Sequence, residues 1–144
     1  MIEEYWKRFL IENNLPKDTK CFEAFKFGST DKQADELLDL VLQGKKVATT
    51  SPYFEDEAYS HKGEYSIVLD SKNIPRCVIQ TTRGRIMMFK DMTYDVCKLE
   101  GEDEVLETWI ENHVAFLKEE YDERNLDFNF NVPIYFEEFK VVYK

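Results

Sequence analysis

Residues 34–51 read ADELLDLVLQGKKVATTS, and this stretch predicts a helix, a turn and the start of a strand. Apolar residues recur at the spacing of one helix face and predict a helix over residues 31–43. They are Ala34, Leu37, Leu38, Val41 and Leu42. Thr30, with Gln33 three residues later, has the pattern of a capping box. Gly44 stands where a left-handed residue ends a helix, and VATTS (47–51) is typical of a β-strand.

The flanking sequence predicts further helices and strands. Apolar spacing indicates helices over residues 3–13 and 103–120. Alternating and β-branched residues indicate strands over 64–70, 76–82 and 85–89, with turn chemistry at 70–73 and a loop at 52–63. The end of the chain, VPIYFEEFKVVYK (132–144), predicts one or two more strands. This order is typical of an α+β fold with a mostly antiparallel sheet or a small barrel.

Length and charge limit the classes of function. The 144 residues fit a single domain, 1–144, with an N-terminal helical extension over about 1–26. Twenty-nine acidic and nineteen basic residues give a net charge of −10, which argues against a broad grip on a nucleic acid backbone. Ten acidic residues and a single lysine lie between residues 100 and 123, so the rest of the chain is nearly neutral. A local basic patch therefore remains compatible with this sequence.

The sequence gives no sign of a metal, a cofactor or a membrane span. The three cysteines, Cys21, Cys77 and Cys97, are far apart and do not form a disulfide framework or a zinc motif. His61 and His113 are not at metal-ligand spacing. The acidic start is unlike a signal peptide, and no apolar run is long enough to cross a bilayer. We expect reduced thiols and a cytoplasmic location.

Lys46 and Thr49 are the residues of this stretch best suited to chemistry. A buried lysine between a helix end and a strand favours the neutral amine, which can act as a base. Strand alternation, however, places Val47 and Thr49 on one face and Lys46, Ala48 and Thr50 on the other, so a Lys46–Thr49 contact requires a turn or bulge. The alternative is a surface lysine beside a half-buried threonine.

Residues 34–51 resemble the signature of the ASCH domain family, whose Gly-x-Lys-x-x-Thr pattern is matched by Gly44 to Thr49. Four other segments resemble the longer bacterial branch of this family. They are Phe27-Gly28-Ser29, Gly63-Glu64-Tyr65, Ile74-Pro75-Arg76-Cys77, and Leu99–Asp103 leading into a helix with Trp109 and His113. The resemblance implies a small mixed or antiparallel β-barrel like that of the PUA domain, with flanking helices. It also implies a cleft at the barrel mouth that binds RNA or a nucleoside- or nucleotide-like ligand.

The resemblance also implies an enzymatic alternative. In a shorter branch of the family, a lysine, a threonine and a glutamate form an amidohydrolase that deacetylates N4-acetylcytidine, and another member is described as a ribonuclease. Carried over to this chain, Lys46 is the base, Thr49 the nucleophile and Glu102 the third member, with Glu100 an equally good match. The longer branch usually reads Glu-Gly-Glu-Gly-Asp, whereas residues 100–104 here read EGEDE.

Five further residues are candidates for contacting a ligand: Ser29, Ser51, Tyr53, Arg83 and Arg85. Trp109 and His113 are four residues apart on one helix, which favours packing of the two rings over catalysis. Three hypotheses follow: a binding domain for a small nucleoside-like ligand or short single-stranded RNA, an amidohydrolase, and a scaffold with a non-functional cleft. The net charge favours a small ligand over a long polymer.

Overall fold

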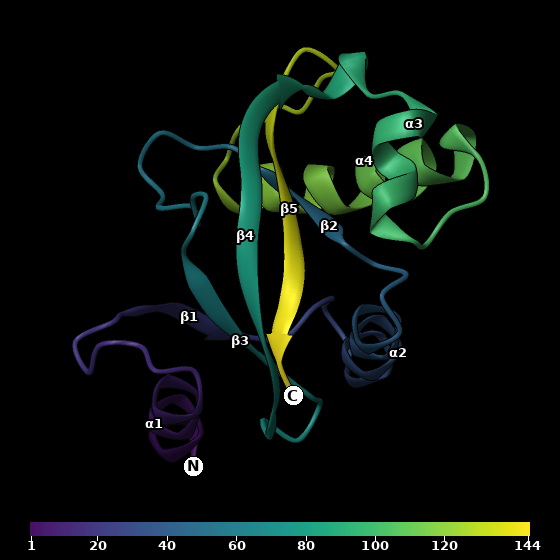
Figure 1. Cartoon of the computed structure of the whole chain (residues 1–144). Helices are drawn as coiled ribbons and strands as arrows, with labels where there is room; N and C mark the ends of the chain where they lie inside the picture. Colours follow the sequence, from purple (N-terminus) through teal and green to yellow (C-terminus); the bar gives the residue numbers. More distant parts are fainter.

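A computed structural model describes all residues, 1–144, and has an α+β fold. The helices are α1 (Ile2–Glu12), α2 (Asp31–Leu42), α3 (Tyr94–Cys97) and α4 (Leu106–Glu123). The strands are β1 (Cys21–Phe25), β2 (Ala48–Pro52), β3 (Tyr65–Leu69), β4 (Pro75–Met88) and β5 (Pro133–Tyr143). Single turns of 3₁₀ helix, η1 (Phe89–Asp91) and η2 (Lys98–Glu100), flank α3. Figure 1 shows α1 and α2 near one end of the strands and α3 and α4 near the other.

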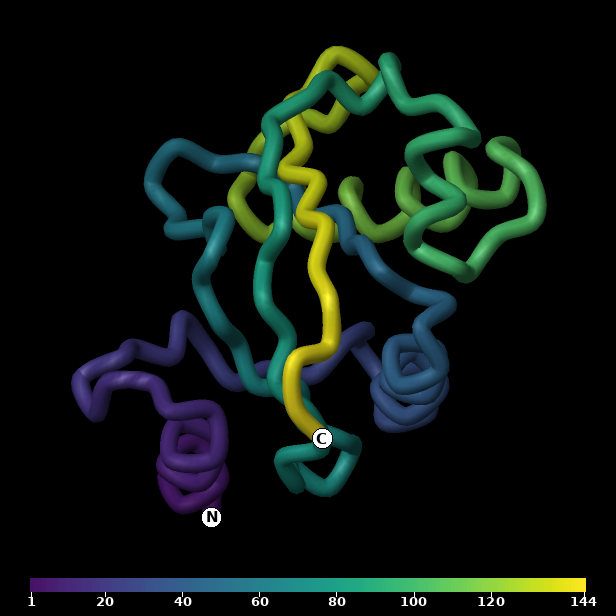
Figure 2. Tube along the Cα trace, viewed as in Figure 1, coloured from purple at the N-terminus to yellow at the C-terminus, as the bar shows by residue number.

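The five strands form one mixed sheet in the order β1-β3-β4-β5-β2. β1 runs parallel to β3, and the other neighbouring pairs are antiparallel. Strands β4 and β5 are long and form the centre of the sheet, as the tube in Figure 2 shows. The edge strands β1 and β2 are not hydrogen-bonded to each other, so the closed barrel expected from the sequence is not observed.

The sheet is nevertheless strongly curled. Glu23 of β1 lies close enough to Glu137 of β5 for their charges to interact, and Phe27, two residues beyond β1, stacks on Phe139 of β5 with ring centroids 6.0 Å apart. β1 and β5 are three positions apart in the sheet, which corresponds to roughly 14 Å when a sheet is flat. The face containing Phe139 is therefore concave, and we call it the inner face. Its further residues, assigned from strand alternation and cross-strand pairing, are Thr49, Ser51, Thr81, Tyr135 and Glu137.

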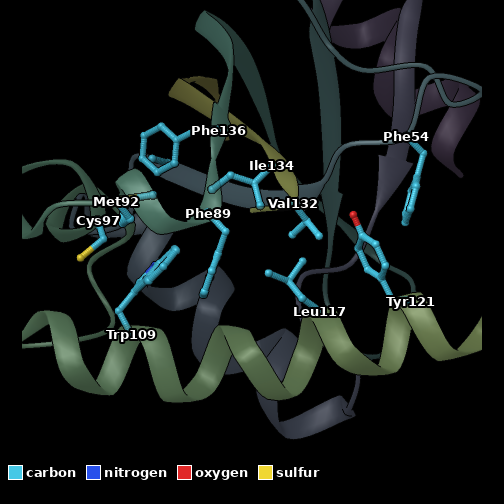
Figure 3. Close-up of a cluster of buried hydrophobic side chains, with 11 residues drawn as sticks. Phe54, Phe89, Met92, Cys97, Trp109, Leu117, Tyr121, Val132, Ile134 and Phe136 are labelled. Carbon is cyan, nitrogen blue, oxygen red and sulfur yellow. The ribbon is translucent and has the colours of Figure 1, made fainter. Parts of the chain in front are cut away.

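Helices cover the two faces of the sheet differently. α2 packs on inner-face residues, with Leu38 and Val41 against Val68 and Ile79. α1 packs on the opposite, outer face. α4 also covers the outer face, and Figure 3 shows its Trp109, Leu117 and Tyr121 pointing at side chains from the sheet and its connections. The outer face is thus filled by core packing, whereas part of the inner face keeps polar side chains.

Local features of the sequence explain most element boundaries. The Thr30 hydroxyl accepts a hydrogen bond from the Gln33 amide at 3.1 Å, as the capping pattern predicts. Gly44 has φ +76°, the left-handed conformation expected just beyond a helix. The Asp70 carboxylate accepts from the amides of Lys72 and Ile74, which forms the predicted turn before β4.

The structure also differs from the sequence prediction in three places. The two strands predicted over 76–82 and 85–89 are one strand, β4, whose register against β5 shifts between Thr81 and Arg83. The predicted helix over 103–120 begins later, at Leu106, because residues 101–105 form a loop. The segment of about 1–26, expected to be a helical extension, is helical only over Ile2–Glu12 and also contains strand β1, which was not predicted because its mixed burial leaves no clear alternation in the sequence.

Cys21, Cys77 and Cys97 are all free thiols. None of the helices has the length and apolar character needed to cross a membrane.

Candidate functional site

Lys46 is fixed where the chain passes from α2 into β2. The amides of Lys45 and Lys46 both donate to the carbonyl of Leu40, at 2.9 and 3.1 Å. The next amide, of Val47, donates to the carbonyl of Leu99 at 2.8 Å. These bonds turn the Lys46 side chain into the protein, where only 2% of the residue is exposed.

The Lys46 ammonium group lies between two carboxylates and a backbone carbonyl. Its Nζ is 2.7 Å from Glu102 Oε2, 2.8 Å from the carbonyl of Ala48 and 3.6 Å from Glu100 Oε1. It also lies 5.4 Å from the centre of the Phe27 ring, a cation–π distance. An ammonium group donates three hydrogen bonds, and three acceptor oxygens surround Lys46 Nζ in this arrangement, so Lys46 acts here as a donor and not as a base.

Glu100 links Lys46 to α4. Its Oε2 accepts hydrogen bonds from Trp109 Nε1 and from Thr50 Oγ1, the latter at 2.9 Å. His113 Nε2 is 3.5 Å from Glu100 Oε1, and the His113 ring stacks on Trp109 with centroids 4.1 Å apart. The pairing of Trp109 with His113 therefore forms as predicted.

The pKa values of this group shift in complementary directions. Burial by itself raises the pKa of Glu100, but the hydrogen bond from His113 and the charge of Lys46 outweigh it and place the pKa below its usual value. Burial by itself lowers the pKa of His113, but the hydrogen bond and charge of Glu100 outweigh it and raise the pKa. The network therefore favours a carboxylate beside an imidazolium.

Gly101 allows the two glutamates to approach Lys46 together. It has φ +72°, and a Cβ at this position would lie 2.3 Å from the carbonyl oxygen of Lys45. A close crossing of two backbones in the left-handed region requires glycine. The missing second glycine of the family pattern does not prevent this, since both Glu100 and Glu102 reach Lys46.

Thr49 does not join this network. Along β2, Ala48, Thr50 and Pro52 are buried while Thr49 and Ser51 are half-buried. Thr50 contacts Glu100, whereas Thr49 lies on the inner face opposite Glu137 of β5. No hydrogen bond joins Lys46 to Thr49, so the structure brings Lys46 to both glutamates but not to the threonine.

Sequence reasoning missed a second polar group, which lies beside Thr49 on the inner face. Glu137 Oε2 accepts a hydrogen bond from Thr81 Oγ1 at 3.0 Å, and the Ser60 hydroxyl lies 2.6 Å from that of Thr81. Burial raises the pKa of Glu137 to about 7. The available signal was Glu137-Glu138 inside an apolar strand, since adjacent residues of a strand point to opposite faces.

Tyr135 holds the loop before β3 against this group. Its hydroxyl donates to the carbonyl of Ser60 at 2.6 Å and crosses directly over Gly84. A Cβ at Gly84 would lie 1.8 Å from that hydroxyl oxygen, so only glycine leaves room for the tyrosine. The hydroxyls beside Glu137 are therefore positioned by packing and not by chance contact.

The other predicted ligand-binding residues have partners within the chain. Ser29 contacts Gln33 through both its amide and its hydroxyl. Tyr53 stacks on Tyr59 with centroids 5.3 Å apart, which leaves its other ring face free of stacking partners. Ser51 is half-buried on the inner face, directly opposite Tyr135.

The two arginines lie on the outer face of β4. Arg83 is exposed and lies 3.9 Å from Glu138. Arg85 is half-buried over the Phe136 ring at 5.4 Å, and its Nε has no hydrogen-bond partner. Both are separated by the sheet from Thr49 and Glu137. The side chains contain no group of three or more His, Cys, Asp and Glu arranged to hold a metal ion.

Comparisons with known proteins bear on the family and the fold. The family model described as "ASCH domain" matches residues 23–143. The crystal structure of protein EF3133 from Enterococcus faecalis V583, assigned to the family model DUF984, superposes with a TM-score of 0.86 at 30% identity, covering 98% of this chain and 92% of that one. The ASCH domain from Lactobacillus crispatus JV V101 gives 0.85 at 25% identity, covering 96% and 94%. The search of curated proteins gave no match.

Proposed function

Since this chain belongs to the ASCH domain family, we propose that it binds a nucleoside- or nucleotide-like ligand, or an unpaired base of a short single-stranded RNA. The proposed site is the inner face around Thr49, bounded where β2 begins by the ion pair of Lys46 with Glu102. The main support is that polar side chains, not core residues, occupy the inner face next to the family signature. Ligand sites commonly combine a largely apolar lining with a few convergent polar groups, which fix the orientation of the ligand.

The charge distribution supports a small ligand. The acidic residues of α4 lie on the helix that covers the outer face, and Lys118 is the only basic residue between positions 100 and 123. Such a surface repels a long phosphate backbone. Glu137, Glu23 and Glu64 make the surroundings of the inner-face site acidic as well, so an uncharged nucleoside meets less repulsion there than a phosphate-bearing strand does.

The direct test is a titration of the protein with cytidine, adenosine, their 5′-monophosphates and a short single-stranded RNA, followed by NMR or calorimetry. Thr49→Val keeps the shape of the side chain but removes its hydroxyl, and should weaken binding by about 5-fold, the equivalent of ~1 kcal/mol for one hydrogen bond. Thr108→Val, on exposed α4, is the matched control and should bind like the wild type. Equal affinities for the wild type and Thr49→Val would place the ligand elsewhere.

Deacylation of a modified nucleoside is the second candidate. The observation in its favour is that Lys46 contacts both glutamates that the family resemblance assigns to the site. It requires a rearrangement, because Thr49 must reach a base before its hydroxyl can attack an amide carbonyl. Release of acetate from N4-acetylcytidine by the wild type, and not by Lys46→Ala, would support this candidate. Absence of both turnover and binding would favour a scaffold.

A further inference from the structure

Glu137 is held in place by a chain of buried hydroxyls. Thr81 has one hydroxyl hydrogen, and it is donated to Glu137 Oε2. Ser60 must therefore donate to Thr81 in the 2.6 Å contact between their hydroxyls. The second oxygen of Glu137, Oε1, receives no hydrogen bond from the chain. Oε2 thus keeps one lone pair beside the bond from Thr81, and Oε1 keeps both, so each oxygen can still accept a hydrogen bond from a ligand.

No cationic side chain neutralises Glu137. None of the ion pairs of the protein includes it, and the charged groups that act on it are Glu23 of β1 and Glu64 ahead of β3, both acidic. The adjacent strands contribute only Thr81 and Gly84 from β4 and Thr49 from β2. A half-buried carboxylate among other carboxylates is unfavourable unless it binds a proton or a partner with N–H donors.

The protonation of Glu137 agrees with this environment. Burial raises its pKa to about 7, the hydrogen bond from Thr81 opposes the rise, and the charges of Glu23 and Glu64 add to it. Near neutral pH the group therefore alternates between a carboxylic acid and a carboxylate. The acid form offers one O–H donor and one carbonyl acceptor side by side.

We propose that Glu137 selects ligands in which a protonatable ring nitrogen lies beside an amino group, as on the pairing edge of cytosine or adenine. Glu137 would bind such an edge in preference to the pairing edge of uracil. This inference rests on the function proposed above. The Oε1 proton is shared with the ring nitrogen, and Oε2 accepts from the amino group. The pair of neutral Glu137 with a neutral base contains the same atoms as the pair of ionised Glu137 with a protonated base. The complex therefore needs no other proton donor. Uracil has N–H at the equivalent ring position, so pairing with it requires the proton on Oε2. That oxygen already accepts from the Thr81 hydroxyl, which favours keeping the proton on Oε1.

The proposal makes a quantitative statement about pH. Because the complex contains one shared proton, cytidine binding should be constant between about pH 5.5 and 6.5. Above the pKa of Glu137 it should fall by about 10-fold per pH unit, since binding then requires proton uptake. Uridine binding should be at least about 5-fold weaker at pH 6, the equivalent of one lost hydrogen bond.

Titrations of cytidine and uridine at pH 6, 7 and 8, followed by NMR, test this with three variants. Glu137→Gln offers the same donor and acceptor as the acid form, so it should keep cytidine binding and lose the pH dependence. Glu137→Leu should bind neither nucleoside. Glu138→Gln, the same substitution one residue later on the outer face, should retain both affinity and pH dependence.

The possible failures are distinguishable. A wild-type pH dependence in Glu137→Gln, or equal affinity for cytidine and uridine, would overturn the role of Glu137 while leaving the proposed binding function in place. Failure of the wild type at pH 6 to bind any of the nucleosides, 5′-monophosphates and the short RNA named above would overturn both.

Discussion

Replacing Lys46 with methionine tests whether the buried ammonium group stabilises the fold. Methionine has similar length and no charge, so it keeps most of the packing against Phe27 and removes the partner of two carboxylates. Glu100 is 2% exposed and keeps its bonds to Thr50 and Trp109, but it loses the Lys46 charge that helps to hold its pKa below the usual value. The variant therefore contains a buried carboxyl group whose one remaining cationic neighbour is His113.

The expected loss follows from the geometry of this network. Removing one partner of a buried ion pair typically lowers the free energy of unfolding by about 3–5 kcal/mol. Glu102, with 29% of its side chain exposed, can turn to water and recovers part of its hydration. Glu100 cannot, and His113 at 3.5 Å compensates only when it is protonated. We expect the free energy of unfolding to fall by about 3 kcal/mol near pH 6 and by more, up to about 5 kcal/mol, near pH 8.

Urea denaturation and thermal unfolding followed by circular dichroism measure this loss. For a domain of this size, ~4 °C per kcal/mol predicts a melting temperature lower by roughly 12–20 °C. Lys45→Met is the matched control, because Lys45 is the exposed neighbour and its substitution should change stability by less than about 0.5 kcal/mol. If Lys46→Met and Lys45→Met have the same urea midpoint and melting temperature, the Lys46 ammonium group does not stabilise the buried carboxylates.

Three further predictions concern His113, Glu137 and the pair of glycines Gly101 and Gly63. The pKa of His113 is raised on folding, so its contribution to stability is full below the unfolded value of about 6.5 and is lost as pH rises through the folded value. His113→Gln should therefore flatten the fall in the urea midpoint above pH 6.5, and an unchanged slope would contradict this. The pKa of Glu137 is also raised on folding, from its ordinary value of 4.5 to about 7, so stability falls as the pH rises between these values. Glu137→Gln should remove this fall, measured by the same urea midpoints. Gly101→Ala should cost about 2–4 kcal/mol, from left-handed strain and the contact with a carbonyl, whereas Gly63→Ala, left-handed but in open space, should cost about 1 kcal/mol by thermal unfolding.

Features set by neighbours in the sequence were predictable, and features set by distant contacts were not. Helix α2 formed as expected, because its apolar spacing, the Thr30 cap and Gly44 act within a few residues. The separation of Thr49 from Thr50 also followed from strand alternation. Strand β1 escaped prediction, because pairing with β3 across 40 residues determines it more than its own sequence does.

The candidate site was predictable as a set of residues but not as an arrangement. The resemblance identified Lys46, Glu100 and Glu102, which the structure brings together across more than 50 residues. It also grouped Thr49 with them, although alternation favours the opposite face. The neighbourhood of Glu137 depends on the curl of the sheet, which brings Glu23 of β1 within electrostatic range of β5. No local pattern in the sequence contains that information.

Because β2 lies at the edge of the sheet, the residues of the short signature Gly44 to Thr49 lie in two different environments. An edge strand has a neighbour on one side only, so residues before it can wrap toward the outer face while its alternate residues line the inner face. Lys46 thereby joins η2 and α4, and Thr49 faces Glu137. Substitutions in the Lys46 network should then change stability first. Substitutions at Thr49 and Glu137 should change ligand preference with a smaller effect on stability, because the inner-face carboxyl is opposed by no cation in the chain.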